Sequence, residues 1–149
     1  MPQKKPPQAT RSLPALDALV GTWAMVGTHP AIPSPVKGTS TFEWLVEGGL
    51  LLWRSDWEPS EIPSAVSVIG RDDSGEAMTV LYTDERGVGR IYEMAFDDGT
   101  WKMWRDSPGF SQRMKGSFNE SGNAITVRGE LSRDGSNWGP DLTVSYTRK

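Results

Sequence analysis

The stretch AMTVLYTDERGVGRIYEMAFDD, residues 77–98, contains two alternating runs of apolar and polar residues around the short turn DERG. The even positions of the second run are larger and more apolar than the odd positions: Val88, Arg90, Tyr92, Met94 and Phe96. A period of two is typical of a half-buried β-strand, and a short turn containing glycine joins two strands into a hairpin. The stretch therefore predicts an antiparallel hairpin whose even-numbered side chains face a core.

The same alternation repeats along the chain, between short turns that are rich in Gly, Asp and Ser. We predict strands at Trp23–His29, Gly38–Glu47, Leu50–Glu58, Ser64–Arg71, Ala77–Asp84, Val88–Asp97, Trp101–Asp106, Phe110–Asn119, Ala124–Ser132 and Leu142–Arg148. The turns are too short for crossover helices, so neighbouring strands are expected to pair antiparallel. A closed barrel leaves no exposed edge. The sequence therefore predicts an all-β fold, an antiparallel up-and-down β-barrel of about ten strands.

Two segments depart from the strand pattern. Residues 13–21, LPALDALVG, have leucines at helical spacing followed by a glycine, which predicts one short N-terminal helix or turn. Residues 1–12 are rich in Pro, Gln and Ser, so a disordered arm is expected there. We therefore expect a single barrel domain over residues 13–149, with a proline-rich loop, HPAIPSPVKG, beside its mouth.

The composition excludes several classes of protein. The net charge of −3 offers no global basic face for nucleic acid or for an anionic membrane surface. No apolar run approaches the roughly 20 residues that span a bilayer, and the first residues lack the apolar segment of a signal peptide. The absence of cysteine excludes disulfides and thiolate sites and fits a reducing compartment. We therefore expect a cytoplasmic protein.

One end of the predicted barrel carries a recognisable pattern. The sequence LVGTW at residues 19–23, placed after a short helix, resembles the calycin superfamily of lipocalins and fatty-acid-binding proteins. In lipocalins the tryptophan of this Gly-x-Trp pattern closes one barrel end, and an arginine from the last strand packs across it. The resemblance implies the same structural closure here, as a cation–π contact between Trp23 and Arg148.

The longer motifs GTW, GTHP, FEWLVEGGLLLWR, VIGRDD, DERGVGRIYEM, FSQRMKGSF and DGSNWGPDLTVSYTR resemble an uncharacterised family of small bacterial calycin-like β-barrels. The related nitrobindins bind haem through a histidine near the C-terminus. The corresponding end of this chain reads LTVSYTRK and has no histidine. The resemblance therefore makes haem binding a disfavoured alternative, and no cofactor is expected.

Alternation places an aromatic and methionine lining inside the barrel, with a few polar groups among it. Such a lining is typical of a site for a small molecule. The residues that we expect to bind a ligand are His29, Trp44, Trp53, Tyr82, Arg90, Tyr92, Met94, Met103, Gln112 and Met114. Seven tryptophans in so short a chain favour a cavity, although a filled core is the alternative.

Two polar residues have alternative interpretations. Arg90 is either the anchor for a ligand carboxylate, which its planar guanidinium binds bidentately, or the ion-pair partner of a rim carboxylate such as Glu43 or Asp84. His29, the only histidine, is either a base or a haem or metal ligand at the mouth, or a turn residue that caps its strand before Pro30. With one histidine and no cysteine, a metal site is not expected.

These observations favour a protein that binds a small apolar or amphipathic molecule inside its barrel. The alternative is an enzyme of cyclase or isomerase type in the same cavity, with His29 or Tyr92 as acid or base and Arg90 stabilising negative charge. The remaining tryptophans Trp57, Trp104 and Trp138 are expected on outward faces or in loops, where an exposed ring could support a homodimer.

Overall fold

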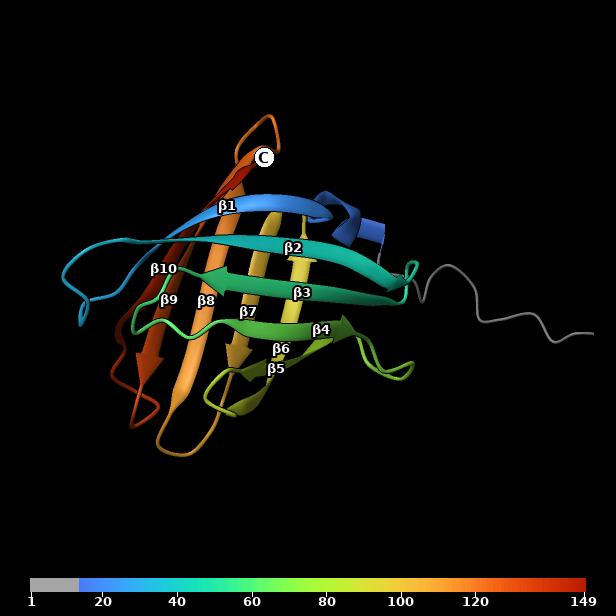
Figure 1. Cartoon of the computed structure of the whole chain (residues 1–149). Coiled ribbons are helices and arrows are strands. Elements are labelled where there is room, and N and C mark those ends of the chain that lie inside the picture. The colour runs from blue at the N-terminus through green and yellow to red at the C-terminus, as the bar shows by residue number, and fades with distance from the viewer. Residues whose placement is uncertain (1–13) are drawn as a thin grey trace, which may run out of the picture.

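The computed structural model describes residues 14–149 (Figure 1). It contains a 3-10 turn and ten strands: η2 (Pro14–Ala18), β1 (Gly21–Thr28), β2 (Val36–Val46), β3 (Leu50–Trp57), β4 (Ala65–Gly70), β5 (Met78–Asp84), β6 (Gly89–Asp97), β7 (Thr100–Arg105), β8 (Ser111–Phe118), β9 (Ala124–Ser132) and β10 (Gly139–Arg148). Each strand pairs antiparallel with its neighbour in the chain, and β1 closes the barrel against β10. The all-β barrel predicted from the sequence is confirmed.

The details differ from the sequence prediction at both ends of the chain. The expected helix is a single 3-10 turn. The last strand begins at Gly139, before the predicted Leu142, because Pro140 pairs with β9 ahead of a β-bulge that ends at Thr143. The expected disordered arm lies outside the described residues. Within residues 14–149, no helix is long and apolar enough to cross a bilayer.

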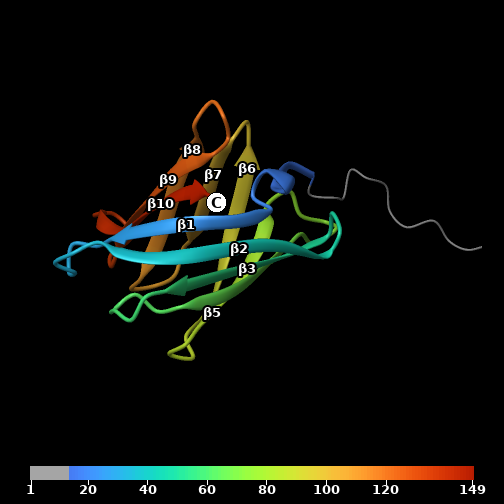
Figure 2. The same ribbon diagram turned by 45° about the horizontal axis from the view of Figure 1, so that its top comes forward.

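One end of the barrel is closed by η2 and the start of β1 (Figure 2). Leu16, Leu19 and Trp23 are almost completely buried there. The Trp23 indole Nε1–H donates to the Leu19 carbonyl at 2.8 Å, and the Arg148 guanidinium lies 4.1 Å from the Trp23 ring centroid. Arg148 also donates to the carbonyls of Val20 and Ala18, at 2.9 Å and 2.6 Å. The contact that the calycin resemblance implies is therefore present.

The register of the strands places the even positions of β6 inside, as the alternation predicts. Tyr92 and Met94 are buried, whereas Ile91 and Glu93 are exposed. The facing strands follow the same pattern, since Met103 pairs with Met94 on one side and with Met114 on the other. Figure 1 shows β1–β4 crossing in front of β7–β9. Inward side chains of the two sides are in contact, since the ring centroids of Phe42 in β2 and Trp101 in β7 lie 6.1 Å apart.

Candidate functional site

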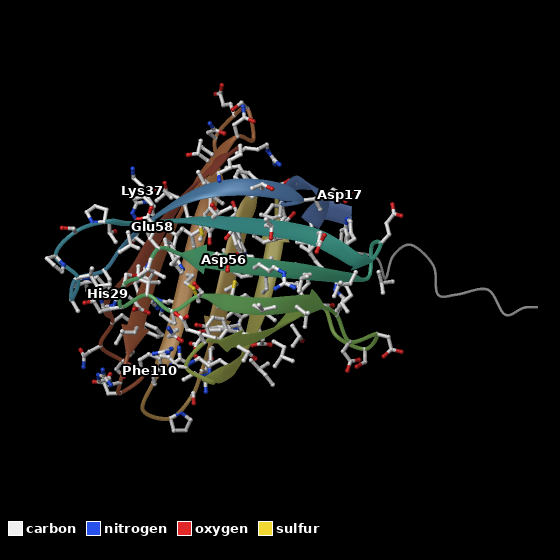
Figure 3. The ribbon with its side chains drawn as sticks, viewed as in Figure 1. Asp17, His29, Lys37, Asp56, Glu58 and Phe110 are labelled. Atoms are coloured by element: carbon white, nitrogen blue, oxygen red, sulfur yellow. The ribbon has the colours of Figure 1, made fainter. Side chains whose placement is uncertain are left out.

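A cavity of about 400 Å³ lies inside the barrel, toward the end where β1 stops. Figure 3 shows His29 and Phe110 at this end and Asp17 of η2 at the other. The wall includes the large aromatic and methionine side chains Trp53, Trp57, Trp101, Met103, Met114 and Tyr146, together with aliphatic and small residues. The volume falls in the range of small-molecule sites, 300–1,000 Å³ in general. The core is therefore filled at one end and hollow at the other.

Most of the residues that the sequence proposed as a ligand site line this cavity: His29, Trp53, Tyr82, Arg90, Tyr92, Met103, Gln112 and Met114. Two do not. Trp44 points toward the closed end, where its indole donates to the Asp17 carboxylate at 2.8 Å. Met94 is completely buried in the core. Both point inward as predicted, but they lie too near the closed end to reach the cavity.

A chain of hydrogen bonds joins four polar side chains at the mouth. His29 Nε2 lies 3.0 Å from Asp141 Oδ1, and the other oxygen of Asp141 accepts a bond from the Gln112 amide at 3.1 Å. The Gln112 carbonyl oxygen in turn accepts a bond from the Tyr92 hydroxyl at 2.8 Å. Each donor therefore meets an acceptor, which fixes the orientation of every group in the chain.

This network sets the tautomer of His29. Its Nδ1 accepts a bond from the backbone N–H of Ala31 at 3.0 Å, so in the neutral ring the proton is on Nε2 and points to Asp141. Both nitrogens are thus occupied within the protein. His29 does not fit an axial haem ligand or a general base, because either role needs a free nitrogen lone pair. Its bond to Ala31 agrees with the turn-capping interpretation.

Tyr92 is equally unsuited to take up a proton. Burial raises the pKa of its hydroxyl, although the nearby guanidinium groups of Arg90 and Arg105 oppose this effect. The phenol is therefore protonated at neutral pH and serves as a donor to Gln112.

In the part of the chain that the structure describes, no group of three or more His, Asp or Glu side chains is arranged to hold a metal ion.

The rim carboxylate Asp84 has its own cation. Its buried side chain accepts bonds from the Arg86 guanidinium, the shortest at 2.6 Å, and from the Tyr82 hydroxyl at 2.7 Å. The hydrogen bond from Arg86 is the main cause that holds the pKa of Asp84 well below its usual range. Asp84 is therefore ionised and fully engaged at neutral pH.

Arg90 does not form the ion pair that was one of its two predicted roles. Asp84 bonds to Arg86 instead, and Glu43 is exposed on the outer face of β2. Over residues 14–149, no carboxylate lies within ion-pair distance of the Arg90 guanidinium. The guanidinium lies 5.0 Å from the Phe110 ring centroid, beside the cavity. It also interacts with the Tyr92 hydroxyl, a neutral partner that leaves the charge of Arg90 without a counter-ion.

Two further polar groups of the wall lack partners. The buried indole Nε1–H of Trp101 has no acceptor among the described residues. The Tyr146 side chain is also buried, and burial alone raises the pKa of its hydroxyl, with no hydrogen bond contributing. Buried donors of this kind are uncommon in completed cores. The second buried donor without a partner among the described residues, Arg71 Nε, follows β4 at the opposite end of the barrel.

Trp57 was expected outside the barrel or in a loop, and this prediction is wrong. Its ring lies over two inward glycines: a Cβ at Gly27 would come within 2.7 Å of the ring, and one at Gly38 within 2.9 Å. The missing side chains let the indole fold inward and line the cavity. Two glycines at inward positions of neighbouring strands were the sequence signal for this arrangement.

The other two tryptophans lie outside the cavity, as expected. The Trp104 indole donates to Glu93 at 2.8 Å on the outer face of the barrel. The Trp138 ring, in the connection before β10, is covered by the Arg113 guanidinium at 3.9 Å. Both rings thus have partners within the chain itself.

No model of a known protein family matches the chain, and no curated protein is similar to it in sequence. Among solved structures, the chain is similar to the crystal structure of Rv2717c from M. tuberculosis, with a TM-score of 0.61 and 13% sequence identity. The match covers 93% of this chain and 99% of that one. The similarity therefore extends over the whole barrel and concerns the fold alone.

Proposed function

We propose that this chain is a calycin-like barrel that binds a small apolar or amphipathic molecule in its interior. The observation that carries the proposal is the cavity of about 400 Å³, which is lined by aromatic and methionine side chains in a protein whose other end is well packed. An enclosed apolar cavity with a few convergent polar groups is the usual form of a small-molecule site.

Binding would be driven by transfer of the ligand from water to this wall. Burying about 200 Å² of apolar ligand surface is worth roughly 5 kcal/mol before the costs of association. The bonded chain from His29 to Tyr92 supplies preoriented polar groups, so little reorganisation is needed on binding. The same bonds occupy both nitrogens of His29 and the Tyr92 proton, which favours binding over acid–base catalysis.

A fluorescent neutral probe tests this function directly. N-phenyl-1-naphthylamine fluoresces weakly in water and strongly in an apolar cavity, so we expect saturable binding to the wild-type protein. Ser67→Phe introduces a ring into the cavity wall and is expected to abolish the signal. Val66→Phe, the adjacent outward position with 40% exposure, is the matched control and should leave the signal intact.

Two results would contradict the proposal: no saturable binding to the wild-type protein, or equal binding to the folded Ser67→Phe variant. Native mass spectrometry of the protein purified from its source organism provides a second readout. A small molecule that remains bound under gentle conditions and is released on unfolding is the expected result.

A further inference from the structure

The charged side chains that line the cavity differ in whether they have an ion-pair partner. Arg86, Arg90, Asp141 and Glu61 line the cavity, and Asp84 lies beside Arg86 at its rim. Asp84 is neutralised by Arg86, and Asp141 accepts bonds from His29 and Gln112. Glu61 is exposed and forms no ion pair within the described residues. Arg90 is therefore a cation in the cavity wall that no described carboxylate neutralises.

The fold holds Arg90 by neutral groups, the Phe110 ring and the Tyr92 hydroxyl, and gives it no carboxylate counter-ion within the described residues. It lies on the inward face of β6, opposite Tyr82 of β5, and its guanidinium lies over the Phe110 ring. Stacking on a ring fixes the plane of a guanidinium but leaves its N–H edge able to bind a carboxylate with two parallel bonds. The Arg133 guanidinium also approaches the Phe110 ring, at 5.8 Å from its centroid, and adds to the positive potential there.

Two groups of aromatic rings lie in the cavity wall near Arg90. The Trp53 and Trp101 centroids lie 5.2 Å apart, and those of Trp101 and Tyr146 lie 5.8 Å apart. Tyr82 and Tyr92 form an edge-to-face pair near the mouth, at 6.0 Å. Ring faces and edges at these spacings favour another flat ring over a flexible alkyl chain, because aromatic pairs gain energy beyond the area they bury.

We propose that the ligand is a compact aromatic carboxylate, whose carboxylate binds Arg90 at the mouth while its rings extend inward toward Trp53 and Trp101. This inference rests on the proposed binding function and specifies its ligand class. The carboxylate supplies the counter-ion that Arg90 lacks, and the rings occupy the aromatic part of the cavity.

Three probes separate the parts of this proposal. 2-Naphthoate carries the charge and the rings, 2-naphthamide keeps the rings and removes the charge, and decanoate keeps the charge and removes the rings. In calorimetric titrations we expect 2-naphthoate to bind at least about tenfold more tightly than 2-naphthamide, since a hydrogen bond to a charged group contributes that much. We also expect it to bind more tightly than decanoate, because aromatic pairs gain energy beyond the area they bury.

Substitutions then locate the anion site. Arg90→Met should remove the preference for naphthoate over naphthamide, and Arg90→Lys should retain part of it, since the charge remains but the planar fork does not. Arg113→Met is the matched control, because Arg113 also covers a ring but lies on the outer face, and it should keep the full preference. Circular dichroism verifies that each variant is folded.

The outcomes distinguish this inference from the binding function. The anion site is contradicted if naphthoate binds no more tightly than naphthamide, or if folded Arg90→Met keeps the preference for naphthoate over naphthamide. In either case binding of naphthamide or of the neutral probe still supports the binding function. Decanoate binding as tightly as naphthoate contradicts the aromatic class. If no probe binds at all, both proposals fail.

Discussion

Two arginines lie over aromatic rings at opposite ends of this barrel, and their surroundings differ. Arg148 covers Trp23 at 4.1 Å and donates to two backbone carbonyls, those of Val20 and Ala18. Arg90 covers Phe110 at 5.0 Å and has no carboxylate partner within residues 14–149. The first arginine completes the fold. The fold positions the second arginine but gives it no counter-ion, which is the expected condition of a residue that binds a ligand.

The largest effect on stability should come from the closed end. Trp23→Ala removes an almost completely buried indole together with its bond to the Leu19 carbonyl. Substitutions of this kind cost about 3–5 kcal/mol of unfolding free energy. Urea denaturation followed by circular dichroism measures the loss, and a loss below about 1 kcal/mol would show that Trp23 does not close the barrel.

The two arginines can be compared directly by the same substitution. Arg148→Met leaves two carbonyls without their charged donor and should cost about 1.5–3 kcal/mol. Arg90→Met removes a cation that has no ion-pair partner, so its cost should be within about 0.5 kcal/mol, or the variant should be slightly more stable. Equal losses in urea denaturation would remove the distinction between the two ends.

Acid should destabilise the mouth through Asp84. The pKa of Asp84 is lowered in the folded protein, so its stabilising effect is fully present above the unfolded pKa of about 3.9 and is lost as the pH falls below that value. Asp84→Asn should therefore cost about 1–3 kcal/mol at pH 7 and somewhat less at pH 3, because the native carboxylate loses its advantage only gradually between the unfolded pKa and its own lower pKa. A difference between wild type and variant that does not change between these pH values would contradict the role of Asp84.

The smallest effect concerns the two deeply buried indoles. Trp23→Phe loses a hydrogen bond to Leu19, whereas Trp101→Phe loses none, because the Trp101 N–H has no acceptor among the described residues. We expect Trp101→Phe to be less destabilising than Trp23→Phe by about 1 kcal/mol, the usual net value of one hydrogen bond. Chemical denaturation of the two variants side by side gives this difference, and the reverse order would contradict it.

The strands and their inward faces could be predicted because alternation with a period of two is a local signal, which is clearest in β6. The contact between Trp23 and Arg148 could be predicted because the resemblance to calycins links the two ends of the chain. The depth of Trp44 and Met94 in the barrel could not be predicted, since alternation gives the face of a side chain and not its height along the barrel axis.

The polar part of the site depends on contacts between distant segments, which alternation does not report. Asp141 lies in a Pro-containing segment that reads as a turn, and the bulge in β10 places it beside His29 and Gln112. Arg90 has no ion-pair partner because Asp84 pairs with Arg86, which lies in the same turn. Neither arrangement is visible without the fold.

A crystal structure of the protein with 2-naphthoate is the most direct test of the claim that Arg90 is an incomplete binding residue. We predict a carboxylate within about 3 Å of the Arg90 guanidinium nitrogens, with the naphthalene ring between the mouth and Trp101. A naphthoate bound only on the outer surface, or one whose carboxylate points away from Arg90, would contradict the account.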